Sequence, residues 1–292
     1  MGKAAGLLIK VLTRKMAKED ERLYALKKDV TEVREIQDIH YAGNLKMDYY
    51  VPKDKGMHDV VVLDIHGGAW VYGDKHLNRH FCMHLAKRGF PVFSMNYDVI
   101  PYVSVKEQIQ EIYQAIHYIL DHASEYGVEN FRLCLCGDSA GAHLASLAAA
   151  IHRDPQLQMR YGVSGEGISI EGLLLQHGIY DLSPMPNSKS FYMRKLYGWM
   201  FPDQSLRDVD SVYDLLDEEW NIPMFLLSSA KDTTFSPQTR QLAKRLEEWK
   251  LPYEMLFWDE EYDLPHVFHI SHPDTKESQQ SIDRMAEFLR KL

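Results

Sequence analysis

Short apolar runs alternate with longer amphipathic segments along most of this chain. Eight runs have the length and composition of β-strands, and they cover residues 33–39, 45–51, 60–65, 91–95, 131–135, 172–176, 223–229 and 253–258. The run at 60–65 is almost entirely apolar, which is typical of a strand buried on both faces. Helices are expected at residues 77–88, 105–126, 140–152, 237–250 and 275–292. This alternation predicts an α/β fold with a mostly parallel sheet of about eight strands and helices on both faces.

Two segments stand apart from this alternation. Residues 1–30 are polar-rich and helical in pattern, with a partial apolar face, and they are a possible cap over a pocket. Residues 182–221 carry several prolines and aromatic residues. They form either a lid that lines an acyl or alcohol pocket or an inserted loop that packs its own aromatic side chains. We therefore expect one domain over residues 1–292 with a small cap region.

Composition and charge narrow the classes of function. The 292 residues carry a formal net charge of −9 and no extended basic stripe, which argues against a nucleic-acid partner. The basic first turns mix with acidic residues from Glu19 onward, so a solvated amphipathic helix is favoured over a membrane-surface segment. No apolar run reaches about 18 residues, so no stable membrane insertion is expected. The three cysteines cannot all pair and lack C-x-x-C spacing, and we expect a cytoplasmic protein.

The segment Gly137-Asp-Ser-Ala-Gly141 follows an apolar run and precedes a helix of small residues. Glycines on both sides of Ser139 allow the strand and the helix to approach closely around a sharp turn. A serine held at the tip of such a turn can be reached by a base on one side and by a substrate on the other. The pattern predicts a nucleophile at Ser139, whereas the alternative is a simple glycine-rich turn.

A serine nucleophile needs a base and a group that orients the base. In sheets of this class such residues follow the carboxyl ends of strands. Asp232 follows the run at 223–229 and is the favoured acid; Asp181 and Asp259 are the alternatives. His266 follows the last strand and is the favoured base; His269 and His272 are more easily interpreted as surface or helix-start residues. The resulting order along the chain is serine, aspartate, histidine.

Attack on a carbonyl also requires donors for the oxyanion. The N–H of Ala140 lies directly after the nucleophile, at the start of a helix. The segment His66-Gly67-Gly68-Ala69-Trp70 ends the strand at 60–65, and its glycines permit the backbone to turn N–H groups inward. We expect the oxyanion hole to include Gly67, Gly68, Ala69 and Ala140.

These motifs resemble the α/β-hydrolase superfamily, specifically the hormone-sensitive-lipase-like esterases and their carboxylesterase relatives. The matching segments begin at Met47, His66, Asn96, Gly137 and His266. The resemblance implies Ser139 as nucleophile, Asp232 as acid and His266 as base, with His66 orienting the glycine loop. The family usually has a third glycine where this chain has Ala69, and an arginine where it has Asp98.

The sequence thus predicts a serine esterase that cleaves small carboxylic esters through an acyl-enzyme, with acyl groups of roughly two to six carbons. An amidase or formamidase acting on small aryl amides is the close alternative. A non-catalytic ligand-binding protein on a hydrolase scaffold is the alternative from another class. No metal or organic cofactor is expected, because no H-E-x-x-H spacing occurs. The expected partner is a small-molecule ester, and a homodimer is possible.

Overall fold

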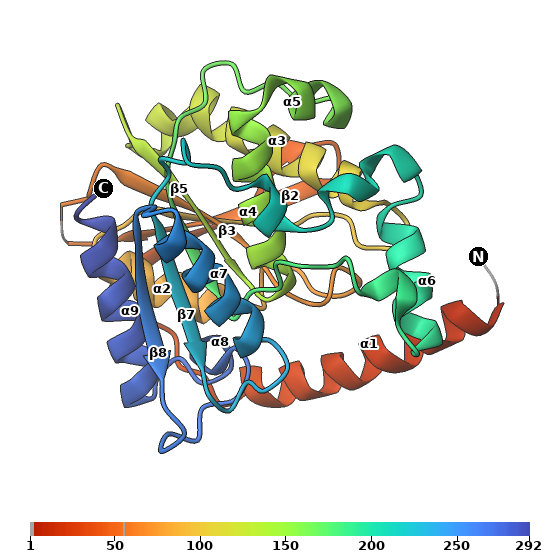
Figure 1. The fold of residues 1–292 in the computed structure, drawn as a ribbon. Coiled ribbons are helices and arrows are strands. Elements are labelled where there is room, and N and C mark those ends of the chain that lie inside the picture. Colours follow the sequence, from red (N-terminus) through yellow and green to blue (C-terminus); the bar gives the residue numbers. More distant parts are fainter. Residues whose placement is uncertain (1–2, 55) are drawn as a thin grey trace.

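The computed structural model describes residues 3–54 and 56–292, and an eight-stranded sheet lies at its centre (Figure 1). The strands are β1 (Val33–Ala42), β2 (Leu45–Pro52), β3 (Val60–Ile65), β4 (Val92–Met95), β5 (Arg132–Asp138), β6 (Ile170–Gln176), β7 (Met224–Ser229) and β8 (Tyr253–Trp258). Their order in the sheet is β1-β2-β4-β3-β5-β6-β7-β8. Strand β2 is antiparallel to β1 and β4, and the other neighbouring pairs are parallel. The expected α/β fold is confirmed.

Helices cover both faces of this sheet. They are α1 (Lys3–Tyr24), α2 (Arg79–Lys87), α3 (Val105–His122), α4 (Ala140–Arg153), α5 (Pro155–Tyr161), α6 (Phe191–Met200), α7 (Ser236–Glu248), α8 (Phe268–Ser271) and α9 (Lys276–Leu289). Side chains of α2 and α9 form one buried cluster with one face of the sheet, and those of α3, α4 and α7 form a larger cluster with the other. The two clusters explain why the central strands are apolar on both faces.

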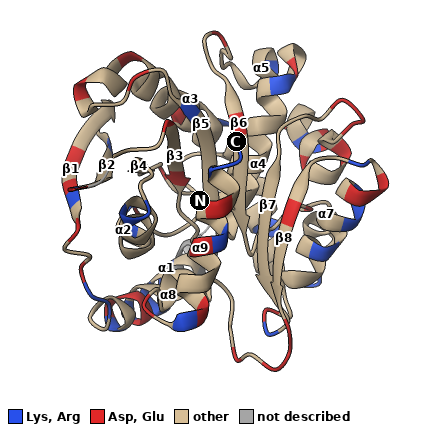
Figure 2. Cartoon of the chain, turned by 90° about the vertical axis from the view of Figure 1, so that its left-hand side faces the viewer, with Lys and Arg blue, Asp and Glu red and all other residues tan. Residues whose placement is uncertain are grey.

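Charged residues lie chiefly on the outer helices and loops (Figure 2). This distribution leaves most positions of the central strands to apolar side chains, which is the pattern from which the strands were predicted. Among the described residues, no helix combines the length and the apolar composition that crossing a membrane requires.

The expected helix at 105–126 is divided. Helix α3 begins with a capping box, in which Ser104 and Glu107 exchange hydrogen bonds with each other's backbone. The α-helix ends at His122, and a 3₁₀ turn, Ala123–Tyr126, continues to Gly127. Helix α5 was not expected, although Asp154 caps it and proline occupies its first position, which is a typical helix start.

The segment 182–221 folds as short 3₁₀ turns around α6. Its aromatic residues Tyr197, Phe201 and Trp220 are at most 3% exposed and belong to the larger core. None of its described residues lines the pocket at the carboxyl ends of the strands. The aromatic side chains of this segment thus pack into the core, and a role of the segment as a lid stays a prediction.

Register brings the ends of the parallel strands together. Gly137 pairs with Ile65, Asp138 pairs with Gln176, and Ser229 pairs with Trp258. Residues that directly follow β3, β5, β6, β7 and β8 consequently meet at one edge of the sheet, and the candidate site lies there.

Candidate active site

Ser139 lies at the tip of a sharp turn between β5 and α4. Its backbone has φ 52° and ψ −115°, which a non-glycine residue rarely adopts. A Cβ atom on Gly137 would stand 2.4 Å from the backbone of Gly141, and one on Gly141 would stand 1.9 Å from the carbonyl oxygen of Ile65. Only glycines fit at these two positions, so the turn has the close strand–helix approach that the sequence predicted.

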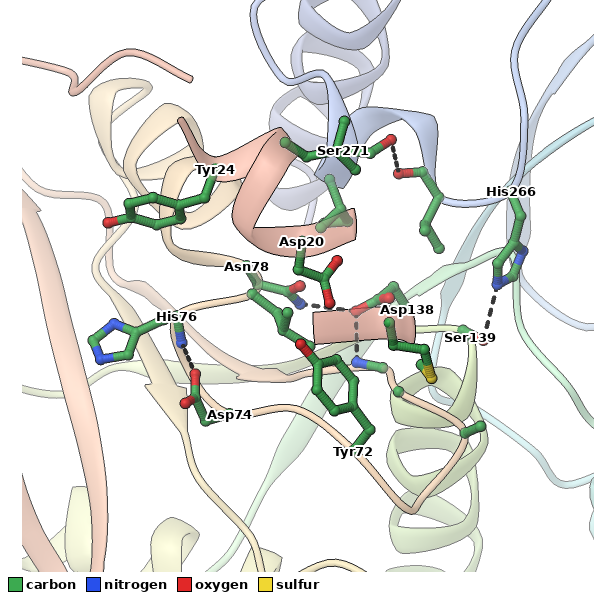
Figure 3. A pocket seen from close by; sticks show the side chains of 18 of the residues that line it. Asp20, Tyr24, Tyr72, Asp74, His76, Asn78, Asp138, Ser139, His266 and Ser271 are labelled. Carbon is green, nitrogen blue, oxygen red and sulfur yellow. Dashed lines mark hydrogen bonds between the residues drawn. The ribbon is translucent and has the colours of Figure 1, made fainter. Parts of the chain in front are cut away.

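The structure brings the expected base and acid to this serine. His266 lies in the loop after β8, and its ring points toward Ser139 (Figure 3). Its Nε2 is 2.9 Å from Ser139 Oγ. Its Nδ1 is 2.7 Å from Asp232 Oδ2, and Asp232 follows β7. Burial acts to raise the pKa of Asp232, but hydrogen bonds from His177 and His266 outweigh it and lower that pKa well below its ordinary value. Asp232 is therefore ionised at neutral pH and can orient the imidazole.

The alternative candidates lie elsewhere. The Asp181 carboxylate accepts hydrogen bonds from the N–H and the hydroxyl of Ser183 in a local turn. Asp259 and His272 are exposed. His269, which the sequence assigned to the surface or a helix start, is completely buried in α8, and its Nε2 is 3.1 Å from Gln176 Oε1. The surface interpretation of His269 is wrong because α8 turns this ring toward the end of β6.

The glycine loop after β3 faces the serine with unusual backbone angles. Gly68 has φ 112° and Ala69 has φ 54°. Within residues 3–54 and 56–292, the N–H groups of Gly68 and Ala69 have no hydrogen-bond partner, so they are free to act as donors. The N–H of Ala140 is the first of α4, where helical N–H groups lack intrahelical partners. These three groups suit an oxyanion.

Gly67 does not belong to the set of oxyanion donors that the sequence predicted. Its N–H donates to Asp138 Oδ1 at 2.9 Å and is not available to a substrate. Its carbonyl oxygen lies 2.7 Å from His66 Nδ1, and Tyr97 donates its hydroxyl to the His66 carbonyl at 2.8 Å. Burial lowers the pKa of His66 to about 4, so this ring is neutral. Gly67 and His66 hold the loop in place, and Gly68, Ala69 and Ala140 remain as the candidate donors.

A buried polar network behind the loop escaped the sequence analysis. Asn78 donates through its Nδ2 to Asp138 Oδ1 at 2.8 Å and to Asp64 Oδ1 at 3.1 Å. Burial raises the pKa of Asp138 and raises that of Asp64 to about 7, with the neighbouring Asp138 charge as the second cause for Asp64. Two acidic residues embedded in apolar strands were the signal that could have revealed this network.

A pocket of about 470 Å³ opens at Ser139 and His266 (Figure 3). Helix α1 forms one wall of it with Met16, Asp20 and Leu23. Burial raises the pKa of Asp20. The pocket is large enough for a small organic substrate.

The site does not fit a metal ion well. Ligand atoms of His177, Asp232 and His266 lie within 4.8 Å of one another. Both histidine Nδ1 atoms are 2.7–2.8 Å from the same carboxylate oxygen, which is hydrogen-bond geometry. Ligands around tetrahedral zinc stand about 3.3 Å apart, given bonds near 2.0 Å. The three residues are better described as a hydrogen-bonded group.

Known proteins share the fold and parts of the sequence. The crystal structure of Esterase B from Lactobacillus rhamnosis superposes with a TM-score of 0.91 at 27% identity, covering 99% of this chain and 95% of that chain. The probable carboxylic ester hydrolase LipM of Mycobacterium tuberculosis is 32% identical over 129 residues, which are 44% of this chain and 30% of LipM. The kynurenine formamidase of Salmo salar is 29% identical over 140 residues, which are 48% of this chain and 44% of that protein.

This chain therefore spans less than half the length of these two curated relatives. The family match is broader, because the model of the BD-FAE family covers residues 47–246, which include Ser139, Asp232 and the glycine loop. The chain has the α/β-hydrolase fold and belongs to the BD-FAE family.

Proposed function

We propose that this protein is a carboxylic ester hydrolase that uses Ser139 as nucleophile, His266 as general base and Asp232 as the orienting acid. The observation that carries the proposal is the continuous hydrogen-bonded arrangement from Ser139 Oγ to His266 Nε2 at 2.9 Å and from His266 Nδ1 to Asp232 Oδ2 at 2.7 Å. Its similarity to Esterase B and to LipM supports the same reaction class.

In the first half of the reaction, Ser139 Oγ bonds to the ester carbonyl carbon while its proton moves to His266 Nε2. The carbonyl oxygen becomes an oxyanion near the N–H groups of Gly68, Ala69 and Ala140, each of which contributes about 3 kcal/mol to transition-state stabilisation. His266 then gives the proton to the departing alcohol as the bond between acyl carbon and alcohol oxygen breaks.

In the second half, His266 removes a proton from water, and the resulting hydroxide oxygen bonds to the acyl carbon. The proton returns to Ser139 Oγ as the acyl-enzyme bond breaks, which releases the carboxylic acid. Asp232 stays ionised throughout, because its pKa lies far below neutrality, and it stabilises the imidazolium that forms in each half.

The size of the pocket supports small acyl groups. A volume of about 470 Å³, closed on one side by α1, accommodates a small ester better than a long lipid chain. A tributyrin phosphonate has been crystallised with Esterase B as an inhibitor. In a series of p-nitrophenyl esters we expect the highest kcat/KM between roughly two and six acyl carbons. An optimum at twelve carbons or more would contradict this preference.

Labelling by a fluorophosphonate tests the nucleophile. We expect the parent protein to be labelled and Ser139→Ala to be neither labelled nor active. Ser271→Ala is the matched control, because Ser271 also lines the pocket but its hydroxyl donates to backbone carbonyls of its own helix. If Ser139→Ala is labelled as strongly as the parent, Ser139 is not the nucleophile. An unlabelled parent protein points instead to a ligand-binding protein on a hydrolase scaffold.

A formamidase is the second candidate, and the similarity to the kynurenine formamidases of Salmo salar and Danio rerio favours it. The same residues would attack a formamide carbonyl, with His266 protonating the departing amine. Matched pairs of aryl acetates, acetanilides and formanilides separate the two candidates. We expect faster turnover of the acetate esters, and a higher kcat/KM for the formanilides would favour the formamidase.

A further inference from the structure

His177 makes a contact with Asp232 that the proposed triad does not require. It directly follows β6, is 0% exposed, and places Nδ1 2.8 Å from Asp232 Oδ2. His266 Nδ1 stands 2.7 Å from the same oxygen atom. The two imidazole rings are nearly perpendicular, with centroids 5.5 Å apart. One carboxylate oxygen thus holds two histidines, one facing the pocket and one inside the core.

We propose that His177 is a positioning residue that shares Asp232 Oδ2 with His266 and thereby sets the pH at which the protein becomes active. This inference rests on the proposed function, because the shared acid must be the one that orients the general base. It concerns a residue that does not touch substrate, since His177 does not line the pocket formed by the described residues.

Geometry determines where the protons lie. Asp232 is ionised, so its Oδ2 can only accept, and both histidines must donate from Nδ1. Burial lowers the pKa of His177, which keeps the ring neutral with no proton on Nε2. That Nε2 has no hydrogen-bond partner within the described residues, as a lone pair facing a dry core would have none. His177 is therefore a fixed neutral donor.

The groups around His177 reinforce this role. His269 of α8 stacks on it with centroids 5.8 Å apart and an interplanar angle of 11°. Phe268 meets it edge to face. The titratable groups facing His177 in the described structure are thus Asp232, His266 and His269, and burial lowers the pKa of His269 well below its ordinary value. Among His177 and these three neighbours, only Asp232 carries a charge when His266 is neutral.

The end of β6 also fixes the nucleophile. The carbonyl oxygen of Gln176 accepts the N–H of Ser139 at 2.8 Å, and the N–H of His177 donates to the carbonyl of Leu227 in β7 at 2.7 Å. His177 itself has φ 50°, a left-handed conformation that histidine tolerates better than bulky apolar residues do. The consecutive residues Gln176 and His177 therefore hold, respectively, the backbone of Ser139 and the side chain of Asp232 in position.

A donor on Oδ2 reduces the negative charge that Asp232 offers to His266. Removing this donor should favour protonated His266, which cannot accept the Ser139 proton. The acid limb of the kcat/KM profile should therefore move to higher pH. A hydrogen bond to a charged group is strong enough to shift that limb by about half to one pH unit. The freed carboxylate should also lower kcat by about tenfold, with KM unchanged.

His177→Asn and His177→Leu form a matched pair for the test. The two new side chains have similar size and shape, but only asparagine places an N–H where His177 Nδ1 stands. Leucine also strains the left-handed backbone, which lowers stability at every pH and leaves the position of the acid limb as the readout specific to the lost donor. We expect His177→Leu to show the raised acid limb and the lower kcat, and His177→Asn to keep the parent profile. His177→Ala replaces the leucine variant if that variant does not fold, as judged by circular dichroism.

Each result bears on the inference separately from the proposed function. If the parent protein hydrolyses esters but the leucine and asparagine variants have the same acid limb, His177 is only a core residue and the inference is wrong. If the parent shows no turnover and no labelling, the proposed function fails first. Proton NMR of the parent protein gives a reading without catalysis: two downfield N–H signals from histidines bound to Asp232 are expected, and a single signal contradicts the shared oxygen.

Discussion

The stability of Asp64→Asn relative to the parent chain should be greater at pH 8 than at pH 4, because asparagine has no buried proton that a rising pH removes. Asp64 lies in β3 with 0% exposure, and burial together with the nearby Asp138 raises its pKa to about 7. Its Oδ2 accepts from Ser94 Oγ at 2.8 Å, and that hydroxyl also lies 3.4 Å from the Lys75 carbonyl. Ser94 can therefore turn its proton to Lys75 and accept an amide N–H instead.

The magnitude follows from the interval between the two pKa values. Between 3.8, the ordinary value, and about 7, the folded protein keeps a proton that the unfolded chain has lost. Stability from this group is thus fully present below the lower value and falls as the pH rises toward the higher one. At about 1.36 kcal/mol per pH unit, the loss is on the order of 4 kcal/mol. Asparagine has no proton to lose, so its advantage over aspartate should grow by that amount.

Urea unfolding followed by tryptophan fluorescence at pH 4, 6 and 8 measures this difference. Asp59→Asn is the control, because its exposed carboxylate is paired with Arg132, whose hydrogen bond lowers the pKa of Asp59. The parent chain should be more stable than Asp59→Asn at high pH, and this difference should disappear as the pH falls. The pH dependence is therefore opposite to that expected for Asp64→Asn. If the free energies of unfolding of Asp64→Asn and the parent stay parallel from pH 4 to 8, Asp64 is not held in its protonated form and the reasoning fails.

Four further substitutions test other parts of the structure. Gly141→Ala would place a Cβ 1.9 Å from a backbone oxygen of β3 and should abolish soluble expression, whereas Gly198→Ala in α6 meets open space and should raise thermal stability slightly, by up to about 1 kcal/mol. Asp232→Asn should lower kcat about 10⁴-fold with little change in KM, as steady-state kinetics would reveal. Lys75→Met should cost about 3–5 kcal/mol in urea unfolding, because it leaves the fully buried Asp48 without its partner at 2.8 Å.

The strands could be predicted because their signal is local. A run such as Val60–Ile65 is apolar at nearly every position, and its observed boundaries are the same as those expected. The Ser139 turn could be predicted for a related reason, since Gly137 and Gly141, which permit its close approach, lie within one segment of five residues. Helix α6 was missed because prolines and aromatic residues around it resembled an irregular loop.

The residues that support the site depend on contacts between distant parts of the chain. Asp138 accepts a hydrogen bond from Gly67, which lies 71 residues earlier, and His177 reaches Asp232, which lies 55 residues later. No spacing rule in one sequence specifies such pairs. His177 nevertheless had a positional signal, because it directly follows a buried strand at the edge where the other site residues gather.

The buried acidic residues around Ser139 lie on two sides of the site, and they have a different role on each side. On one side, Asp232 is ionised and holds two histidine donors. On the other side, Asn78 joins Asp138 to Asp64, and two carboxylates so close in the core cannot both carry a charge without a large cost. A proton on Asp64 leaves the Asp138 carboxylate as acceptor for both Asn78 and the N–H of Gly67. Because Gly67 donates its N–H to Asp138, the glycine loop is fixed while the N–H groups of Gly68 and Ala69 stay unpaired among the described residues, and an oxyanion hole requires such unpaired donors.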